Sequence, residues 1–264
     1  MNQLTRHINK ASALFASGCF LFSSVVLFTL SGCEKYLEMP VKDKMPQDVL
    51  FSNEQGFMDA LTGVYLGMDK TNGGPSRGLY TRDLSLGMLS VMANNYTNAN
   101  QFILDDGMYK SVANYDYAQS TVKQEISFIW AGMYNNIANV NNLLGKIDGK
   151  KDLFSRDHYQ RVKGEALALR ALFHFDLARL YGKSPVTGLN EKAIPYVTKF
   201  GAGSTPFVTL NVALDSCISD LNKAKSLLAN ADTTSLQEGS LDLISGYSQN
   251  HLNYWATKAL LARV

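Results

Sequence analysis

The stretch RVKGEALALRALFHFDLARLYG, from Arg161 to Gly182, decides the fold of this chain. Its apolar residues recur at spacings of three and four, which places them on one face of a helix of about six turns. These residues are Val162, Ala166, Leu169, Phe173, Leu177 and Leu180. Because so long an apolar stripe is unfavourable in water, we expect that face to be buried.

A second apolar stripe precedes this stretch and has the same spacing. It consists of Ile126, Trp130, Met133, Ile137, Val140, Leu144 and Ile147. We predict helices over roughly Val122 to Ile147 and Tyr159 to Tyr181, joined by the polar link DGKKDLFSRDH. Two long helices with a short link pack their stripes together, so the core begins as a helical hairpin.

Three further helices are predicted outside the hairpin. The first lies in FSNEQGFMDALTGVYLGM, where Ser52 or Asn53 can cap its N-terminus. The second covers about Leu210 to Leu228. The third is HLNYWATKALLARV at the end of the chain. Three prolines between Gly182 and Leu210 predict an extended loop with a short strand pair. The fold class is therefore all-α, with antiparallel helix pairs of the tetratricopeptide type and long irregular loops.

The N-terminal 32 residues have the layout of a secretory signal peptide, because Arg6 and Lys10 precede an apolar run from Ala11 to Leu30. The run ends in LSGC, which resembles a bacterial lipobox, so Cys33 is the expected lipidation site. A transmembrane anchor or a chance cysteine is the alternative, since about 20 apolar residues suffice to span a bilayer. Several acyl chains on Cys33 would hold the protein firmly at a membrane.

Residues 33–48, rich in charge and proline, are predicted to be a membrane tether, and residues 49–264 to form the folded domain. Without the signal peptide, basic and acidic residues balance at 23 each, which argues against nucleic-acid binding.

Cys217 would then be the only cysteine left besides Cys33, so no disulfide is expected, and it is interpreted as a small core residue. The last helix is still running at Val264, from which we expect a truncated chain.

The segment from Asp69 to Thr121 is rich in Asn, Asp and Tyr and has only short apolar runs. Loops on a rigid scaffold are where binding residues usually lie. Hydrogen-bond donors, acceptors and aromatic faces for a neutral hydroxylated ligand are combined here in two groups. The candidate ligand-binding residues are Arg82, Asp83, Asn94, Asn95 and Tyr96, and then Tyr109, Asp116 and Tyr117. For each of them an ordinary role in a surface turn is the alternative.

Other conspicuous residues are interpreted as structural. Trp130 and Trp255 are predicted to be core residues. Glu165 and Arg170 are expected to fix neighbouring loops or helix ends by charge-assisted hydrogen bonds. An amide-rich helix face is expected to be mostly solvated or bonded to adjacent loops; it consists of Asn135, Asn136, Asn139, Asn141 and Asn142.

The sequence predicts no catalytic site, metal site or cofactor. Asp105 and Asp106 are adjacent and would diverge, whereas a glycosidase needs two carboxyl groups facing each other across a bond. His158, His174 and His251 lack metal-ligand spacing, and His174 is interpreted as a helix histidine with a hydrogen-bond partner. No phosphate-binding glycine loop is present.

Six blocks in order resemble the SusD/RagB outer-membrane lipoproteins of Bacteroidota. They are LSGCEKYLE, FSNEQGFMDALTGVY, IWAGMYNNIANVNNLLGKI, VKGEALALRALFHFDLARLYGKSP, CISDLNKAKSLL and YWATKALLARV. The resemblance implies a tetratricopeptide-like scaffold and a more variable irregular part that binds a nutrient, usually a glycan. It also implies a SusC-type TonB-dependent transporter as partner, and a chain about twice this length.

We therefore expect a lipid-anchored, surface-exposed outer-membrane protein that is not an enzyme. It would bind a glycan or oligosaccharide and deliver it to the transporter. A helical-repeat scaffold that binds only protein partners at the outer membrane is the alternative.

Overall fold

The computed structural model describes residues 45–69, 78–96, 107–234 and 250–264, so the predicted signal peptide, Cys33, Asp105 and Asp106 lie outside the described residues. The chain divides into two units, Met1–Pro46 and Gln47–Val264, and the architecture below is that of the second unit. The helix α2 (Gln47–Leu50) already includes the last two residues assigned to the tether. The predicted boundaries of signal, tether and domain stay predictions.

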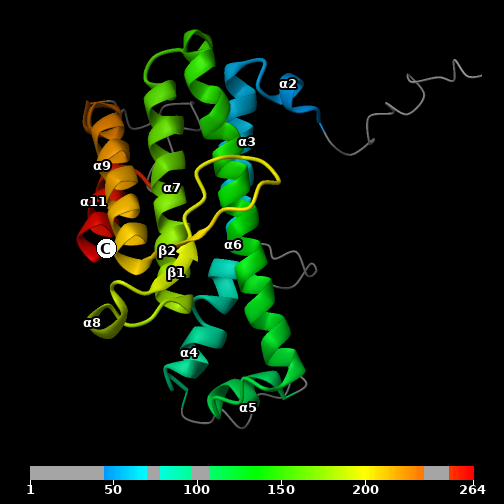
Figure 1. Ribbon diagram of the computed structural model, residues 1–264. Coiled ribbons are helices and arrows are strands. Elements are labelled where there is room, and N and C mark those ends of the chain that lie inside the picture. The colour runs from blue at the N-terminus through cyan, green and yellow to red at the C-terminus, as the bar shows by residue number, and fades with distance from the viewer. Residues whose placement is uncertain (1–44, 70–77, 97–106, 235–249) are drawn as a thin grey trace, which may run out of the picture. The chain divides into compact units, whose positions relative to one another are not determined.

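The predicted hairpin is the centre of the fold. It consists of α6 (Ser120–Ile147) and α7 (His158–Tyr181), joined through a short 3-10 helix, η4 (Asp148–Leu153). Both predicted stripes face inward, and Met133, Ile137, Leu169 and Phe173 are fully buried between them. The helices lie side by side along most of their length (Figure 1).

The helix α7 is buried on two faces, whereas the sequence predicted burial of one. Its second face packs against α9 (Leu210–Thr234), and α9 in turn packs against α11 (Tyr254–Arg263). This second core consists of Leu167, Ala168, Ala171, Phe175, Cys217, Leu221, Ala224 and Leu260. The small alanines allow the two backbones to approach closely, and they carry little hydropathy signal of their own.

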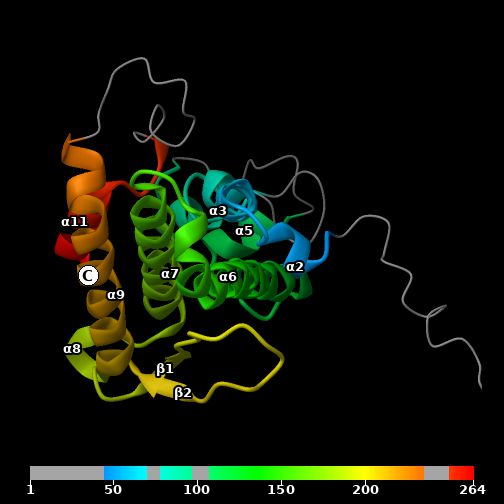
Figure 2. The same ribbon diagram turned by 90° about the horizontal axis from the view of Figure 1, so that it is seen from above.

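The hairpin of α6 and α7 is covered from two opposite sides (Figure 2). On one side lies α3 (Glu54–Asp69), whose N-terminus is capped by Asn53, because Oδ1 of Asn53 accepts a hydrogen bond of 3.0 Å from the backbone N–H of Gly56. On the other side lies an antiparallel strand pair, β1 (Lys192–Pro195) and β2 (Phe207–Thr209), in which Ile194 pairs with Val208. The predicted cap and the predicted strand pair are both confirmed.

Short helices make up the described part of the segment predicted to be least regular. They are η2, a π-helix (Leu79–Asp83), α4 (Met88–Met92) and α5 (Met108–Ala113). Another short helix, α8 (Pro185–Gly188), follows α7. Figure 1 shows α4 and α5 at the end of the hairpin opposite to the link between α6 and α7.

Two structural interpretations differ in outcome. Trp130 is partly buried, and its ring lies 4.8 Å from those of Tyr134 and Tyr181, as expected for a residue packed on the core. The prediction for Trp255 is wrong, because 57% of this residue is exposed. The helix α11 turns Thr257 and Leu260 inward, and Trp255 lies on its outer side next to Tyr254.

The polar residues of the hairpin bind other elements, as predicted. Oε2 of Glu165 accepts a hydrogen bond of 2.7 Å from the hydroxyl of Tyr65 on α3 and lies 3.1 Å from Nδ1 of His251. Within the amide-rich face, Asn136 and Asn141 are buried and donate to the backbone carbonyls of Gly67 and Val197. Asn135 and Asn139 are exposed. Among the described helices, none is long and apolar enough to cross a membrane.

Candidate ligand-binding site

Arg82 is the centre of a charged cluster at the end of η2. Its Nε and Nη2 both lie 2.6 Å from Oδ1 of Asp83, and Nη2 also donates to Oε1 of Glu125 over 2.9 Å. Both carboxyl groups are buried, with side chains 1% and 2% exposed, whereas the Arg82 side chain is 34% exposed. Arg82 is thus fixed from the protein side and presents its remaining nitrogen, Nη1, which bonds none of the described residues.

Tyr109 of α5 lies beside this cluster. A Cβ atom added to Gly87 would lie 2.7 Å from the carbonyl oxygen of Arg82 and 2.9 Å from the hydroxyl of Tyr109. A side chain at position 87 would therefore collide with both groups, and glycine allows them to approach each other. Of the eight predicted residues, the structure brings Arg82, Asp83 and Tyr109 together.

The electrostatics of the cluster are dominated by its two buried carboxyl groups. Burial and the neighbouring Glu125 carboxylate raise the pKa of Asp83 to about 6, against the opposing effect of Arg82. Oδ2 of Asp83 is buried, and no donor from the described residues lies against it. The sequence does not predict a role for Glu125, because its partner Arg82 lies 43 residues away and the residues around it on α6 do not distinguish it from other helix glutamates.

The other predicted residues, from both groups, lie around the ends of α4 and α5, which pack against each other. Both helices end in the same hydrogen-bonded turn, with a residue in the left-handed region: Asn94 with φ of 56° and Tyr115 with φ of 55°. Asn is a common residue at such a position, but a tyrosine there is strained. The hydroxyl of Tyr115 donates to the carbonyl of Met92 over 2.7 Å, which ties the two turns together.

The polar atoms of this group are partly used within the protein. The hydroxyl of Tyr96 donates to the carbonyl of Leu86, and Nδ2 of Asn95 lies 3.5 Å from Oγ of Ser90. The carboxylate of Asp116 accepts from the backbone N–H of Ala118 and from the amide of Gln119, so it stabilises the turn before α6. These hydrogen bonds stabilise the loop conformations that form this surface.

Tyr117 contributes an aromatic ring to the same surface. It is 40% exposed and packs edge to face against Tyr115, with the ring centroids 6.4 Å apart. Tyr115 itself is 57% exposed and was not among the predicted residues, since its position after the end of α5 has no local sequence signal. We call the surface formed by η2, α4, α5 and residues 114–119 the tyrosine platform.

Another group, at the opposite end of the hairpin, contains the residue types of a hydrolase triad. Nδ1 of His158 lies 2.5 Å from Oε1 of Glu54 and 3.4 Å from Oγ of Ser155. A triad needs the serine and the carboxylate on different ring nitrogens, but here both contact Nδ1, and Ser155 also bonds Glu54 directly. The group links the start of α3 to the start of α7. Within the described residues, no three His, Cys, Asp or Glu side chains are arranged to hold a metal ion.

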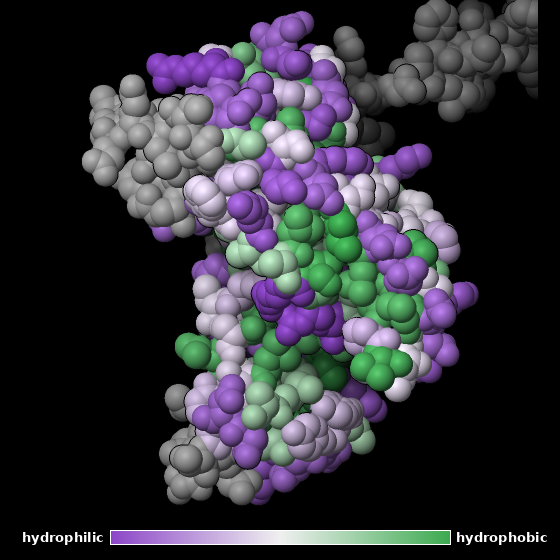
Figure 3. Space-filling view, turned by 90° about the vertical axis from the view of Figure 1, so that its left-hand side faces the viewer, coloured by the Kyte–Doolittle hydropathy of each residue, from purple (hydrophilic) through white to green (hydrophobic). Residues whose placement is uncertain are grey.

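Two surface pockets lie away from the tyrosine platform. One, of about 460 Å³, lies between α7 and α9 and is lined by residues such as Lys163 and Leu227. The other, of about 370 Å³, lies where α7, α9 and α11 meet and is lined by Leu210, Leu214, Arg179 and Arg263, among others. Figure 3 shows the molecule from the side of α9 and α11. On this face, hydrophobic side chains surround a group of hydrophilic ones. None of the predicted site residues lines either pocket.

Comparison with known proteins identifies the family. Residues 35–264 match the model of a SusD-like family described as starch-binding and associating with the outer membrane. The chain belongs to this SusD-like family. A SusD-like protein of Formosa agariphila is 24% identical over 162 residues, which are 61% of this chain and 29% of that protein.

Solved structures of SusD-like proteins share the fold. The match to a SusD-like carbohydrate-binding protein from Bacteroides vulgatus has a TM-score of 0.57 at 18% identity and covers 80% of this chain and 40% of that one. The match to a SusD superfamily protein from Bacteroides thetaiotaomicron has a TM-score of 0.55 at 20% identity, with coverage of 80% and 42%. The chain thus spans less than half the length of these relatives, and the predicted helical fold of the family is confirmed.

Proposed function

We propose that this SusD-like chain binds a glycan or oligosaccharide at the tyrosine platform. The observation that carries the proposal is Arg82, whose guanidinium is fixed by Asp83 and Glu125 while its side chain stays 34% exposed next to Tyr109. The description of the family as starch-binding supports a carbohydrate as the ligand.

The chemistry of the platform suits a neutral sugar. A fixed donor loses little conformational entropy when it binds a hydroxyl group, and an exposed aromatic ring packs against the apolar face of a pyranose. Arg82 supplies the donor, and Tyr117, supported by Tyr115, supplies the ring. Two acidic side chains, Asp83 and Glu125, already bind the single positive charge of Arg82, so an anionic ligand has no advantage.

Calorimetry of the protein against a glycan panel that includes maltoheptaose tests this proposal. Arg82→Ala and Tyr117→Ala should each weaken binding at least tenfold, since a hydrogen bond to a charged group contributes about 1.5–3 kcal/mol and an aromatic contact a similar amount. Arg156→Asn is the matched control, because it changes an exposed arginine in the link between α6 and α7, at φ of 49°, which Asn tolerates. Circular dichroism would confirm that the variants fold. If no glycan of the panel bound to the protein while peptides did bind, the proposal would be overturned.

We further propose that the protein is anchored through an acylated Cys33 at the outer membrane, exposed at the cell surface, and delivers its ligand to a SusC-type TonB-dependent transporter. The lipobox-like LSGC and the family description support this placement. Cys33→Ala should abolish palmitate labelling and release the protein from the membrane fraction. Protease treatment of intact cells tests the surface exposure, and co-purification tests the transporter partner.

A scaffold that binds only protein is the second candidate. Exposed apolar side chains around α8 and the strand pair favour it, since Val186, Leu189, Phe200 and Phe207 are each at least 40% exposed. Co-purification of a transporter without any binding of small molecules would support this candidate. We expect no catalysis in either case, so incubation with an oligosaccharide should release no new reducing ends.

A further inference from the structure

Tyr115 occupies a backbone position at which glycine or asparagine is usual. The backbone N–H of Asp116 donates to the carbonyl of Ser111 over 2.9 Å. The N–H of Tyr115 donates to the carbonyl of Val112 over 3.0 Å, so α5 ends in a Schellman motif. The left-handed residue of this motif is Tyr115, with φ of 55°. Its Cβ atom makes that conformation unfavourable.

The end of α4 has the same motif with a residue that suits it. The N–H of Asn95 donates to the carbonyl of Ser90, and the N–H of Asn94 to that of Val91, each over 3.0 Å. The left-handed residue here is Asn94, with φ of 56°, and asparagine adopts this conformation readily. Of the two turns, the one at Tyr115 carries the unfavourable residue, so the turn itself does not explain the tyrosine.

The side chain of Tyr115 is fixed although it lies at the surface. Its hydroxyl donates to the carbonyl of Met92, the last residue of α4, over 2.7 Å. Its ring packs edge to face against Tyr117, with an angle of 68° between the ring planes. Tyr115 nevertheless stays 57% exposed, so burial in the core does not explain the strained conformation either.

We propose that Tyr115 is a second ligand-contacting residue of the tyrosine platform, whose ring packs against the apolar face of a sugar next to Tyr117. That the ligand is a glycan rests on the proposed function. Strained residues persist where the surrounding structure fixes them, and they are concentrated at binding sites. The bond to Met92 fixes the ring here before the ligand binds, so little conformational entropy is lost on binding.

Two variants separate a ligand contact from a mere clamp between α4 and α5. Tyr115→Phe keeps the ring and removes the hydroxyl bond to Met92. Tyr115→Gly removes the ring as well, at a backbone position that glycine tolerates. If the ring contacts the ligand, Tyr115→Phe should weaken glycan binding by less than about threefold and Tyr115→Gly by about tenfold.

Arg156→Gly is the matched control. Arg156 is another exposed residue with a left-handed backbone, at φ of 49°, and it lies in the link between α6 and α7, away from the platform. Its replacement by glycine should leave glycan affinity unchanged. The control shows whether loss of a side chain at a left-handed position is by itself enough to weaken binding.

The experiment combines two measurements on the whole chain. Calorimetry with maltoheptaose, or with the tightest-binding glycan of the panel, gives the affinities of the wild type and the three variants, whose folding is checked by circular dichroism. In NMR spectra of tyrosine-labelled protein, the ring signals of Tyr115 are identified by their loss in Tyr115→Phe. In the wild type these signals should shift on addition of the same glycan and saturate at the calorimetric Kd.

The outcomes are distinguishable. Equal losses of affinity in Tyr115→Phe and Tyr115→Gly would overturn the contact and leave Tyr115 as a clamp. Wild-type affinity in Tyr115→Gly, or ring signals that the glycan leaves unchanged, would overturn it as well. If no glycan bound to the wild type, the proposed function would fail together with the contact, and this outcome is read from the wild type alone.

Discussion

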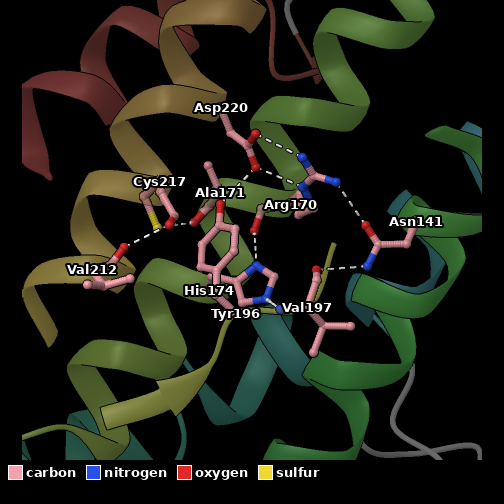
Figure 4. Close-up of polar contacts among 10 residues, drawn as sticks. Asn141, Arg170, Ala171, His174, Tyr196, Val197, Val212, Cys217 and Asp220 are labelled. Carbon is pink, nitrogen blue, oxygen red and sulfur yellow. Dashed lines mark hydrogen bonds and ion pairs between the residues drawn. The ribbon is translucent and has the colours of Figure 1, made fainter. Parts of the chain in front are cut away.

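Arg170 of α7 and Asp220 of α9 form a buried ion pair with two parallel hydrogen bonds, from Nε to Oδ2 over 2.7 Å and from Nη2 to Oδ1 over 2.8 Å. Nη1 of Arg170 also donates to Oδ1 of Asn141 on α6, and the hydroxyl of Tyr196 donates to Asp220. Figure 4 shows how these side chains converge from different elements. Three helices and the segment after β1 are thus linked by one buried polar network.

Removal of one partner of this pair should be strongly destabilising. We expect Asp220→Ala to lower the free energy of unfolding by about 3–5 kcal/mol, because it leaves the Arg170 charge buried and unpaired. Urea denaturation measures the change. Asp215→Ala is the matched control on the same helix, and it should change the stability by less than about 0.5 kcal/mol because Asp215 is exposed. Equal effects of the two substitutions would contradict a role for the pair.

His174 should remain neutral well below the usual pKa of histidine. Its Nδ1 donates to the carbonyl of Arg170, and its Nε2 accepts from the backbone N–H of Val197, each over 2.9 Å, so a second ring proton would point at another donor. Burial, which outweighs the other effects, lowers its pKa from 6.5 to about 4. Ring NMR should show His174 uncharged at pH 5.5.

The lowered pKa of His174 determines the direction in which the free energy of unfolding changes with pH. Because the folded state binds the proton of His174 less readily than the unfolded state, its contribution is fully present above pH 6.5 and is lost as the pH falls toward 4. The full contribution is about 3 kcal/mol. In urea titrations at pH 7 and pH 4.5, His174→Gln should lose less stability than the wild type on acidification. An equal loss in both proteins would contradict the assignment.

The long helices were predictable because their stripes repeat over many turns. The predicted span from Val122 to Ile147 differs from α6 by two residues, and the span from Tyr159 to Tyr181 differs from α7 by one. The second buried face of α7 was not predictable in the same way, since alanines such as Ala168 and Ala171 carry a weak apolar signal. The burial of Trp255 was wrongly predicted because the size and hydropathy of a residue do not determine on which side of a short helix it lies.

For the candidate site, residue types were predictable and partnerships were not. Arg82 and Tyr109 carry hydrogen-bonding and aromatic groups suited to ligand binding, which can be read from the residue types alone. Glu125 and Tyr115 acquire their roles only through tertiary contacts, with Arg82 and with the carbonyl of Met92, 43 and 23 residues away in the chain. Similarly, Arg161 opens the stretch that decides the fold, yet the sequence does not reveal that it is completely buried and bonded to the side chain of Asp157 and the carbonyl of Ala231 on α9.

The close approach of α7 and α9 can be tested at Gly164. A Cβ atom there would lie 2.7 Å from Cγ of Leu228, a fully buried side chain, and 3.4 Å from the carbonyl oxygen of Ala224. Gly164→Ala should therefore lower the free energy of unfolding by about 1–3 kcal/mol, because overpacking outweighs the better helix propensity of alanine.

Gly145 on α6 provides the matched control for this substitution. A Cβ atom at Gly145 would have no neighbour within 4 Å, so Gly145→Ala should raise the free energy of unfolding by about 0.5–1 kcal/mol through helix propensity alone. Urea denaturation of both variants measures the two changes in the free energy of unfolding, which should have opposite signs. If Gly164→Ala were as stabilising as Gly145→Ala, the second face of α7 would not pack against α9 as closely as the structure shows. The second core between these helices would then lack the tight contact that Gly164 allows.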